Sequence, residues 1–155
     1  MNASAKIKEV RIRPARREDS ASLAKLSGQL GYPATAEIIS SRLDAAAQDS
    51  TSIVLVAELP SGEIVGFSQF VHQRLIEADP RAEVAALVVD ESLRGHGVGR
   101  LLLANGEQWA RERGCKFVNL RSNVIRAGAH SFYERLGYSH YKTQKAFRKD
   151  LGERE

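Results

Sequence analysis

An apolar run followed closely by a glycine-rich turn is the feature that most constrains the fold of this chain. Residues 84–89 are apolar at every position, which is typical of a strand covered on both faces in the middle of a sheet. The sequence RGHGVGR follows at residues 94–100, and an apolar stripe at helical spacing begins at Val98 and ends before Gly114. A buried strand, a glycine turn and a helix in this order predict an α/β fold with a mixed sheet.

Periodicity along the rest of the chain predicts the other elements. Pro60, Ser61 and Gly62 separate two β-rich runs, which indicates a hairpin. Asp19 or Ser20 and Thr35 are suitable caps for two helices that lie before it. We expect strands over residues 7–13, 53–59, 64–71, 84–89, 117–120 and 138 to about 148. We expect helices over residues 20–28, 36–49, 98–113 and 129–136.

The composition favours one folded, water-soluble domain over residues 1–155, with 43% hydrophobic and 27% charged residues. The net charge of +4 is spread along the chain without a basic block, so we expect no nucleic-acid partner. No apolar run approaches the roughly 18 residues of a membrane-spanning helix, and no apolar segment follows the first basic residues. Cys115 is the only cysteine, so we expect a cytoplasmic protein with no disulfide. We also expect no membrane partner and no metal.

The glycine-rich turn is suited to binding an anion. The first N–H groups of a helix have no partner within the helix, and glycines let phosphate oxygens approach them. Arg94 and Arg100 add positive charge, so a diphosphate is the expected ligand. The G-x-G-x-G spacing matches neither the dinucleotide-binding fingerprint nor the P-loop, which disfavours a nucleotide-binding module. From this loop alone, a glycine-rich connection that only turns the chain tightly is nearly as good an explanation as ligand binding.

Two motifs together resemble the GNAT superfamily of N-acetyltransferases. Arg94, Gly97 and Gly99 match the R-x-x-G-x-G signature, and residues 129–138 match the A-x-x-F-Y-x-x-x-G-[FY] segment of that family. The resemblance covers nearly the whole chain, although the first half matches only in layout. It implies an α/β fold with a mostly antiparallel, twisted sheet of six to seven strands, flanked by about four helices. It also implies acetyl-CoA as the co-substrate.

The resemblance carries cofactor contacts onto particular residues. The pantetheine arm of the cofactor would lie along the strand that contains Leu87, Val88 and Val89, with a backbone N–H near Val88 facing the thioester oxygen. The glycine turn would bind the pyrophosphate. Its residues are Arg94, Gly95, His96, Gly97, Val98, Gly99 and Arg100. Asn123 and Arg126 are further candidates for cofactor contacts. Relatives often carry an asparagine seven residues before the tyrosine; this chain has Arg126 at that position, and Asn123 lies three residues earlier.

Catalytic groups follow from the same resemblance. Tyr133 holds the position of the general acid, although without the motif it would be interpreted as a core tyrosine. Relatives often place a glutamate where this chain has Ala85 and Ala86. Glu83 is the expected base, acting through a water, and a solvated carboxylate at the end of a strand is the competing interpretation. His72 and His130 are alternatives for the base.

The acceptor is expected to be a primary amine of a small molecule. Position in the layout suggests that Arg74 or Arg81 holds an anionic end of such an amine. Other candidates for the acceptor side are Gln29, Tyr32, Glu37, Gln69 and His72. Three alternatives stay open, namely a protein N-acetyltransferase, a coenzyme-A-binding sensor that has lost the chemistry, and the disfavoured nucleotide-binding module. A homodimer through the C-terminal strand is an expectation from the exposed edges of such sheets.

Overall fold

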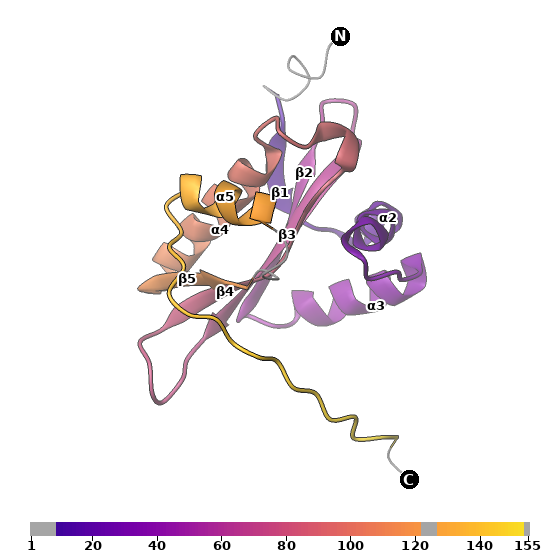
Figure 1. The fold of residues 1–155 in the computed structure, drawn as a ribbon. Helices are drawn as coiled ribbons and strands as arrows, with labels where there is room; N and C mark the ends of the chain where they lie inside the picture. Colours follow the sequence, from indigo (N-terminus) through magenta and orange to yellow (C-terminus); the bar gives the residue numbers. More distant parts are fainter. Residues whose placement is uncertain (1–8, 122–126, 154–155) are drawn as a thin grey trace. The chain divides into compact units, whose positions relative to one another are not determined.

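The computed structural model describes residues 9–121 and 127–153 of the chain. These residues fall into two compact units, Met1–Arg121 and Ser122–Glu155, which are described separately below. The first unit contains the whole of the sheet and three of the helices labelled in Figure 1.

The first unit is built on a mixed sheet of five strands in the order β1-β2-β3-β4-β5 (Figure 1). The first four strands pair in antiparallel fashion, whereas β5 pairs with β4 in parallel. The predicted mixed sheet is therefore confirmed, and so is the hairpin between β2 and β3. The strands are β1 (Arg11–Pro14), β2 (Ser52–Glu58), β3 (Ile64–Gln73), β4 (Arg81–Val89) and β5 (Phe117–Leu120).

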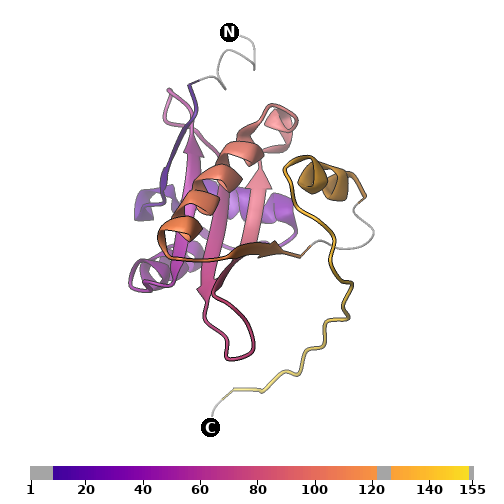
Figure 2. The ribbon, with the colours of Figure 1, turned by 90° about the vertical axis from the view of Figure 1, so that its left-hand side faces the viewer.

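Helices cover both faces of this sheet. Helices α2 (Ser20–Leu30) and α3 (Ala36–Ala47) lie on one face, and α4 (Val98–Glu112) lies on the other (Figures 1 and 2). The predicted cap of α3 is confirmed, because the Thr35 hydroxyl accepts a hydrogen bond from the N–H of Ile38 at 3.2 Å. The 3-10 turns η1 (Arg17–Asp19) and η2 (Glu91–Leu93) precede α2 and α4.

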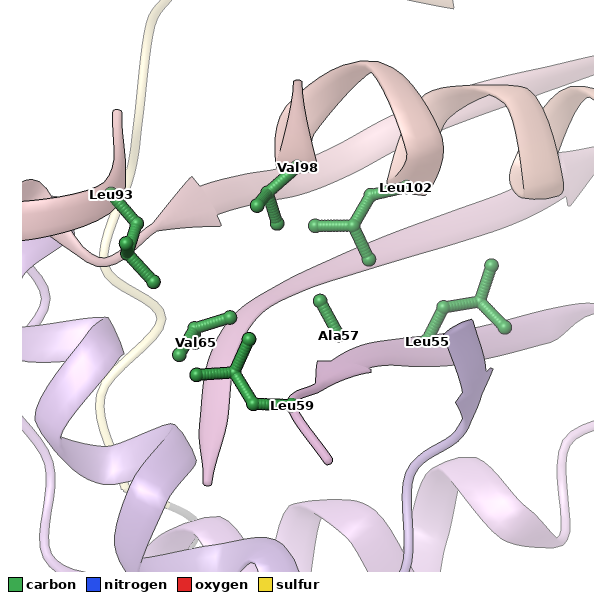
Figure 3. Close-up of a cluster of buried hydrophobic side chains, with 7 residues drawn as sticks. All are labelled: Leu55, Ala57, Leu59, Val65, Leu93, Val98 and Leu102. Carbon is green, nitrogen blue, oxygen red and sulfur yellow. The ribbon is translucent and has the colours of Figure 1, made fainter. Parts of the chain in front are cut away.

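The face under α4 is closely packed. Leucine and valine side chains from η2 and α4 point toward apolar side chains of β2 and β3 (Figure 3). Further along α4, Gly106 lies against the ring of Phe70, and a Cβ at position 106 would be 2.0 Å from two ring carbons. A glycine is therefore required for this helix to approach the sheet so closely. The cluster drawn in Figure 3 consists of Leu55, Ala57, Leu59, Val65, Leu93, Val98 and Leu102.

The face under α2 and α3 has its own core, which is bounded by charge at the β1 end. The Arg13 guanidinium donates to both carboxylate oxygens of Asp19 at 2.9 Å and, through Nε, to Glu58 at 2.8 Å. Burial opposes ionisation of Asp19, but hydrogen bonds from Arg13 and from the N–H of Arg16 outweigh it and lower the pKa of Asp19. The apolar members of this core are Leu23, Leu26, Ile39, Val56, Ile64 and Val88.

The second unit contains helix α5 (Ala127–Arg135). Gly137 ends this helix in a left-handed conformation with a φ of 91°, and the N–H of Tyr138 donates to the carbonyl of Tyr133 at 3.0 Å. The predicted helix over residues 129–136 is therefore confirmed to within two residues at its start.

Three details of the predicted sheet are wrong. The described residues contain five strands rather than six to seven, because residues 138–148 form no strand. A β-type pattern shows which residues suit a strand, but not whether an open edge is available for pairing. Only Ala82 and Val88 are fully buried in β4, and Ala85 is exposed, so β4 is not covered along both faces. The first strand is Arg11–Pro14, so residues 9 and 10 do not belong to it as predicted, while residues 7 and 8 lie outside the described residues.

Candidate functional site

A bulge interrupts β4 at Ala85. Gln69 of β3 faces Ala86, whereas Phe70 faces Val84, so Ala85 has no partner in the β3 register. On the other side, β5 pairs with β4 only from Arg81 to Val84. Beyond the bulge, the described residues offer no strand partner to this edge of β4. The backbone groups of Ala85 to Val88 that face away from β3 are therefore available to bind an extended ligand chain.

The glycine turn lies at the end of the same strand. Gly95 and Gly97 have φ values of 83° and 90°, in the left-handed region that only glycine adopts at low cost. Gly97 is the N-cap of α4 and has no side chain, so no cap occupies the first N–H groups of the helix. The first helical hydrogen bond runs from the N–H of Leu101 to the carbonyl of Gly97 at 3.2 Å. The N–H groups before Leu101 precede the first helical hydrogen bond, an arrangement that suits the binding of an anion.

Charged and polar side chains around this turn hold it in place. Arg94 is exposed, and its Nε donates to the carbonyl of Val89 at 3.4 Å. Asp90 caps η2 by accepting hydrogen bonds from the hydroxyl and the N–H of Ser92, which lower its pKa. Gln29 of α2 accepts from the N–H of Glu91 at 3.1 Å. The carboxylate of Asp90 is thus engaged within its own turn, while the guanidinium of Arg94 stays near the glycines.

A cavity of about 420 Å³ lies between the sheet and the two helices α2 and α3. Its floor includes Phe67 and Gln69 of β3 together with Ala85 and Ala86 of the bulged strand. The cavity therefore adjoins the residues at which β4 loses its neighbours. The residues that the helices, their connection and β2 contribute are Leu23, Ser27, Leu30, Tyr32, Ile39, Arg42, Leu43, Ala46 and Val54.

Comparison with known proteins identifies the family. The model of the acetyltransferase (GNAT) family matches residues 21–138 of this chain. The chain belongs to the GNAT family. The match begins in α2 and runs through the glycine turn to the end of the second motif, so it includes both motifs that carried the resemblance in the sequence.

Named GNAT acetyltransferases resemble the chain to different extents. An aminoalkylphosphonate N-acetyltransferase of Salmonella typhimurium is 40% identical over 91 residues, which are 57% of this chain and 59% of that protein. The aligned part thus spans less than two thirds of that relative. An aminoglycoside N(6')-acetyltransferase type 1 of Stenotrophomonas maltophilia is 30% identical over 144 residues, which are 90% of this chain and 93% of that protein.

A solved GNAT structure has the same fold. It is an aminoglycoside N-acetyltransferase in complex with CoA, with a TM-score of 0.80 and 18% identity, and the match covers 90% of this chain and 94% of that one. At this identity the likeness concerns the fold alone.

Glu83, the candidate base, lies on the face of the sheet that α2 and α3 cover. The bulge reverses the alternation of β4, so Glu83 and Ala86 share that face although they are an odd number of residues apart. The Glu83 carboxylate accepts a hydrogen bond from Gln73 at 2.9 Å and lies 3.4 Å from the Arg121 guanidinium. Arg81 donates to the same Gln73 at 3.1 Å. Glu83 is thus fixed by neighbours and is not a free strand-end carboxylate.

The candidate acid, Tyr133, lies in the second unit. Its ring centroid is 5.4 Å from that of Phe132 and 6.2 Å from that of Tyr138. His130 lies in the same helix, α5. Asn123 and Arg126 lie outside the described residues, so their suggested cofactor contacts stay predictions.

The residues predicted for the acceptor side do not lie together in the structure. Tyr32 and Gln69 line the cavity, whereas Glu37 lines a different, polar hollow beside Arg17. His72 pairs with the fully buried Ala82, and its pKa is lowered first by burial and then by the charges of Arg74 and Arg113. That surrounding places His72 near the end of α4, away from the cavity lining, and therefore weakens it as a base.

Sequence reasoning missed Arg42, which lines the cavity from α3. A signal was present, because Arg42 lies three residues after Ile39 and four before Ala46, at the spacing of one helix face. A cation on the inward stripe of an amphipathic helix indicates either a chain that extends to solvent or a ligand contact.

Proposed function

We propose that the chain is an acetyl-CoA-dependent N-acetyltransferase that acetylates a primary amine of a small molecule. One observation carries the proposal: α4 begins without a capping side chain, directly after two glycines with positive φ, at the end of a strand whose edge is open. The family to which the chain belongs makes an acetyl donor the expected ligand. We also propose that residues 1–155 act as one domain, since the family match runs through both compact units.

The residues present fit the anionic part of the cofactor. A Cβ built on Gly95 or Gly97 meets no other atom within 4 Å, so open space lies in front of the turn. The N–H groups there, with exposed Arg94 and Arg100, would hold the pyrophosphate. The backbone of Leu87, Val88 and Val89 would hold the pantetheine arm as an added strand. The cofactor would supply the acetyl thioester to the bulged part of β4.

In the proposed reaction the acceptor nitrogen forms a bond to the acetyl carbon and the carbon–sulfur bond breaks. Glu83, acting through a water, takes the proton that the amine loses. The Tyr133 hydroxyl gives a proton to the departing thiolate. A phenol has a reference pKa of about 10 and a thiol one of about 8.5, so this transfer is modestly uphill. The competing proposal is a sensor that binds coenzyme A without turnover.

Ligand-dependent thermal stability tests the cofactor site. CoA and acetyl-CoA should raise the melting temperature, because a ligand at about 100 times its dissociation constant stabilises the folded chain by about 2.7 kcal/mol. ATP and NAD serve as controls and should give a smaller shift at the same concentration. A larger shift with NAD or ATP would instead support a nucleotide-binding module.

Turnover of acetyl-CoA with a panel of amines tests the reaction. Tyr133→Phe should lower kcat by about 100-fold, as is typical when a general acid is removed, and leave the CoA-induced thermal shift unchanged. Tyr141→Phe, an exposed tyrosine of the same unit, is the matched control. Equal turnover by wild type and Tyr133→Phe would refute the acid role. CoA binding by wild type with no turnover of any amine would support the sensor.

A further inference from the structure

The cavity under α2 and α3 combines an apolar body with a single charge. Of its lining residues, Arg42 is the charged one, and no aspartate, glutamate or lysine is among them. Most of the others are aliphatic or aromatic, and the remaining polar groups are Ser27, Tyr32 and Gln69. The Ser27 hydroxyl already donates a hydrogen bond to the carbonyl of Tyr32 at 2.6 Å. At about 420 Å³ the cavity is near the lower end of the range for small-molecule sites.

Arg42 reaches this cavity from α3. Ile39, Arg42, Leu43 and Ala46 line it at helical spacing. Arg42 is itself exposed, so it lies at the solvent-exposed rim of the cavity. Within the described part of the chain, the Arg42 guanidinium has no hydrogen-bond or ion-pair partner. Arg17 provides the contrast, because it donates to Ser40 at 3.0 Å and lies 3.9 Å from Asp44.

The carboxylates of α3 are directed elsewhere. Glu37 and Asp44 line the polar hollow that Arg17 and Ser20 also line. The charges of α3 are thus divided between two sides, with the cation at the apolar cavity and the anions outside it. Coulomb attraction therefore favours an anionic group in the cavity and disfavours a second cation beside Arg42.

The two ends of the cavity differ in chemistry. Ala85 and Ala86 belong to the bulged strand, where the proposed acetyl transfer takes place, and Glu83 lies on the same face of that strand. Arg42 belongs to α3, the helix that covers this face of the sheet. An acceptor with its amine at the strand would therefore direct its other end toward the guanidinium, across the apolar lining.

We propose that the acceptor is a small amine that carries one anionic oxygen group, a carboxylate or a phosphonate, separated from the amine by an apolar segment. Arg42 binds the anionic group and so determines specificity. This inference rests on the proposed N-acetyltransferase function. It replaces the sequence-based suggestion of Arg74 or Arg81, since neither lines the cavity and Arg81 is engaged by Gln73. Polycationic aminoglycosides do not match this cavity, although relatives that acetylate them belong to the same family.

Amines that share one carbon chain test the proposal. The set is pentylamine, 5-aminopentanoate, 5-aminopentylphosphonate and 1,5-diaminopentane, with kanamycin as an aminoglycoside. We expect kcat/KM for at least one anionic amine to exceed that of pentylamine by about tenfold or more, the typical effect of a charge-assisted hydrogen bond. The carboxylate and phosphonate arms distinguish the two sources of the anion. The diamine and kanamycin should be poorer substrates than pentylamine.

Variants of Arg42 show whether the preference comes from this side chain. Arg42→Gln should reduce the ratio of anionic to neutral kcat/KM to about one, Arg42→Lys should keep part of it, and Arg42→Glu should favour the diamine. Arg111→Gln, an exposed arginine on α4 at the opposite face, is the matched control and should leave the ratio unchanged. Melting temperatures of the variants verify that each is folded.

Calorimetric titration of 5-aminopentanoate and of 5-aminopentylphosphonate into wild type and Arg42→Gln separates the two proposals. Arg42-dependent binding without acetylation of any amine would refute the proposed function and support the anion site. Acetylation of pentylamine as rapidly as of the anionic amines, with a ratio that Arg42→Gln does not change, would overturn the anion site and leave the function intact. Preference for kanamycin or the diamine in wild type would also overturn it.

Discussion

The two faces of the sheet in the first unit are covered in different ways. Under α4, apolar side chains of the helix and the sheet form one core, and Gly106 has no room for a Cβ beside Phe70. Under α2 and α3, the core ends at a cavity on one side and at the ion pair of Arg13 and Asp19 on the other. The same strands therefore present a packed surface to one layer and a partly open, partly charged surface to the other.

This difference separates stability from binding. Close packing resists any change in volume, so we expect the α4 face to fix the strand and the glycine turn. The opposite face leaves small side chains, Ala85 and Ala86, next to space that a small molecule can occupy. We expect substitutions under α4 to act mainly on folding, and substitutions at the cavity to act mainly on turnover.

The largest effect on stability should come from the buried charges on the open face. Arg13→Ala leaves Asp19 and Glu58 without their partner, and removal of one member of a buried ion pair typically costs about 3–5 kcal/mol. Urea denaturation measures the loss. Arg17→Ala is the control, because its exposed contact with Asp44 should contribute less than about 1 kcal/mol. Similar losses in both variants would contradict a structural role for the buried pair.

Two glycine-to-alanine substitutions, one on each face of the sheet, should have smaller effects on stability, and these effects should be opposite in sign. Gly106→Ala adds a methyl group 2.0 Å from the Phe70 ring and should destabilise the chain by about 1–3 kcal/mol, despite the better helix propensity of alanine. Gly28→Ala in α2 meets no atom within 4 Å and should stabilise by up to about 1 kcal/mol. A Gly106→Ala variant as stable as Gly28→Ala would show that the α4 face can adjust.

Two alanines of β4 give the same comparison on one strand. Ala86→Val places a larger side chain in the cavity and so reduces the space for the acceptor. It should change the free energy of unfolding by less than about 0.5 kcal/mol while lowering kcat/KM for the acceptor by about tenfold. Ala82 is fully buried, and Ala82→Val should cost about 1–3 kcal/mol. Unfolding curves and turnover of acetyl-CoA are measured on both variants. Unchanged turnover in Ala86→Val would exclude the cavity as the acceptor site.

Local signals in the sequence predicted most of this architecture. The cap at Thr35, the hairpin around Gly62 and the start of α4 at Val98 depend on a few neighbouring residues, and all three are confirmed. The bulge at Ala85 depends on the register between two strands, and a pattern within one strand does not contain it.

The cavity and its arginine were beyond sequence reasoning for a related reason. An apolar run such as residues 84–89 predicts that these side chains are shielded from water. It does not predict how closely a helix from another part of the chain approaches them. Arg42 was not among the predicted site residues, because an arginine on a helix usually lies on a solvated face. Its role depends on the gap between α3 and the bulged strand, which only the three-dimensional structure contains.

The smallest effect should appear on acidification, and it should begin on the open face. The pKa of Asp19 lies below its ordinary value of about 3.9 because the hydrogen bonds from Arg13 and Arg16 outweigh the effect of burial. A depressed pKa means that the ionised carboxylate stabilises the fold above about pH 4, and that this contribution is lost as the pH falls through the lower, folded pKa. Each unit of the difference contributes about 1.4 kcal/mol. Hydrogen exchange should therefore show protection in α2 falling below pH 4 before protection in α4 does. Asp19→Asn should lack this step, and loss of protection first in α4 would mean that the packed face is the weaker one.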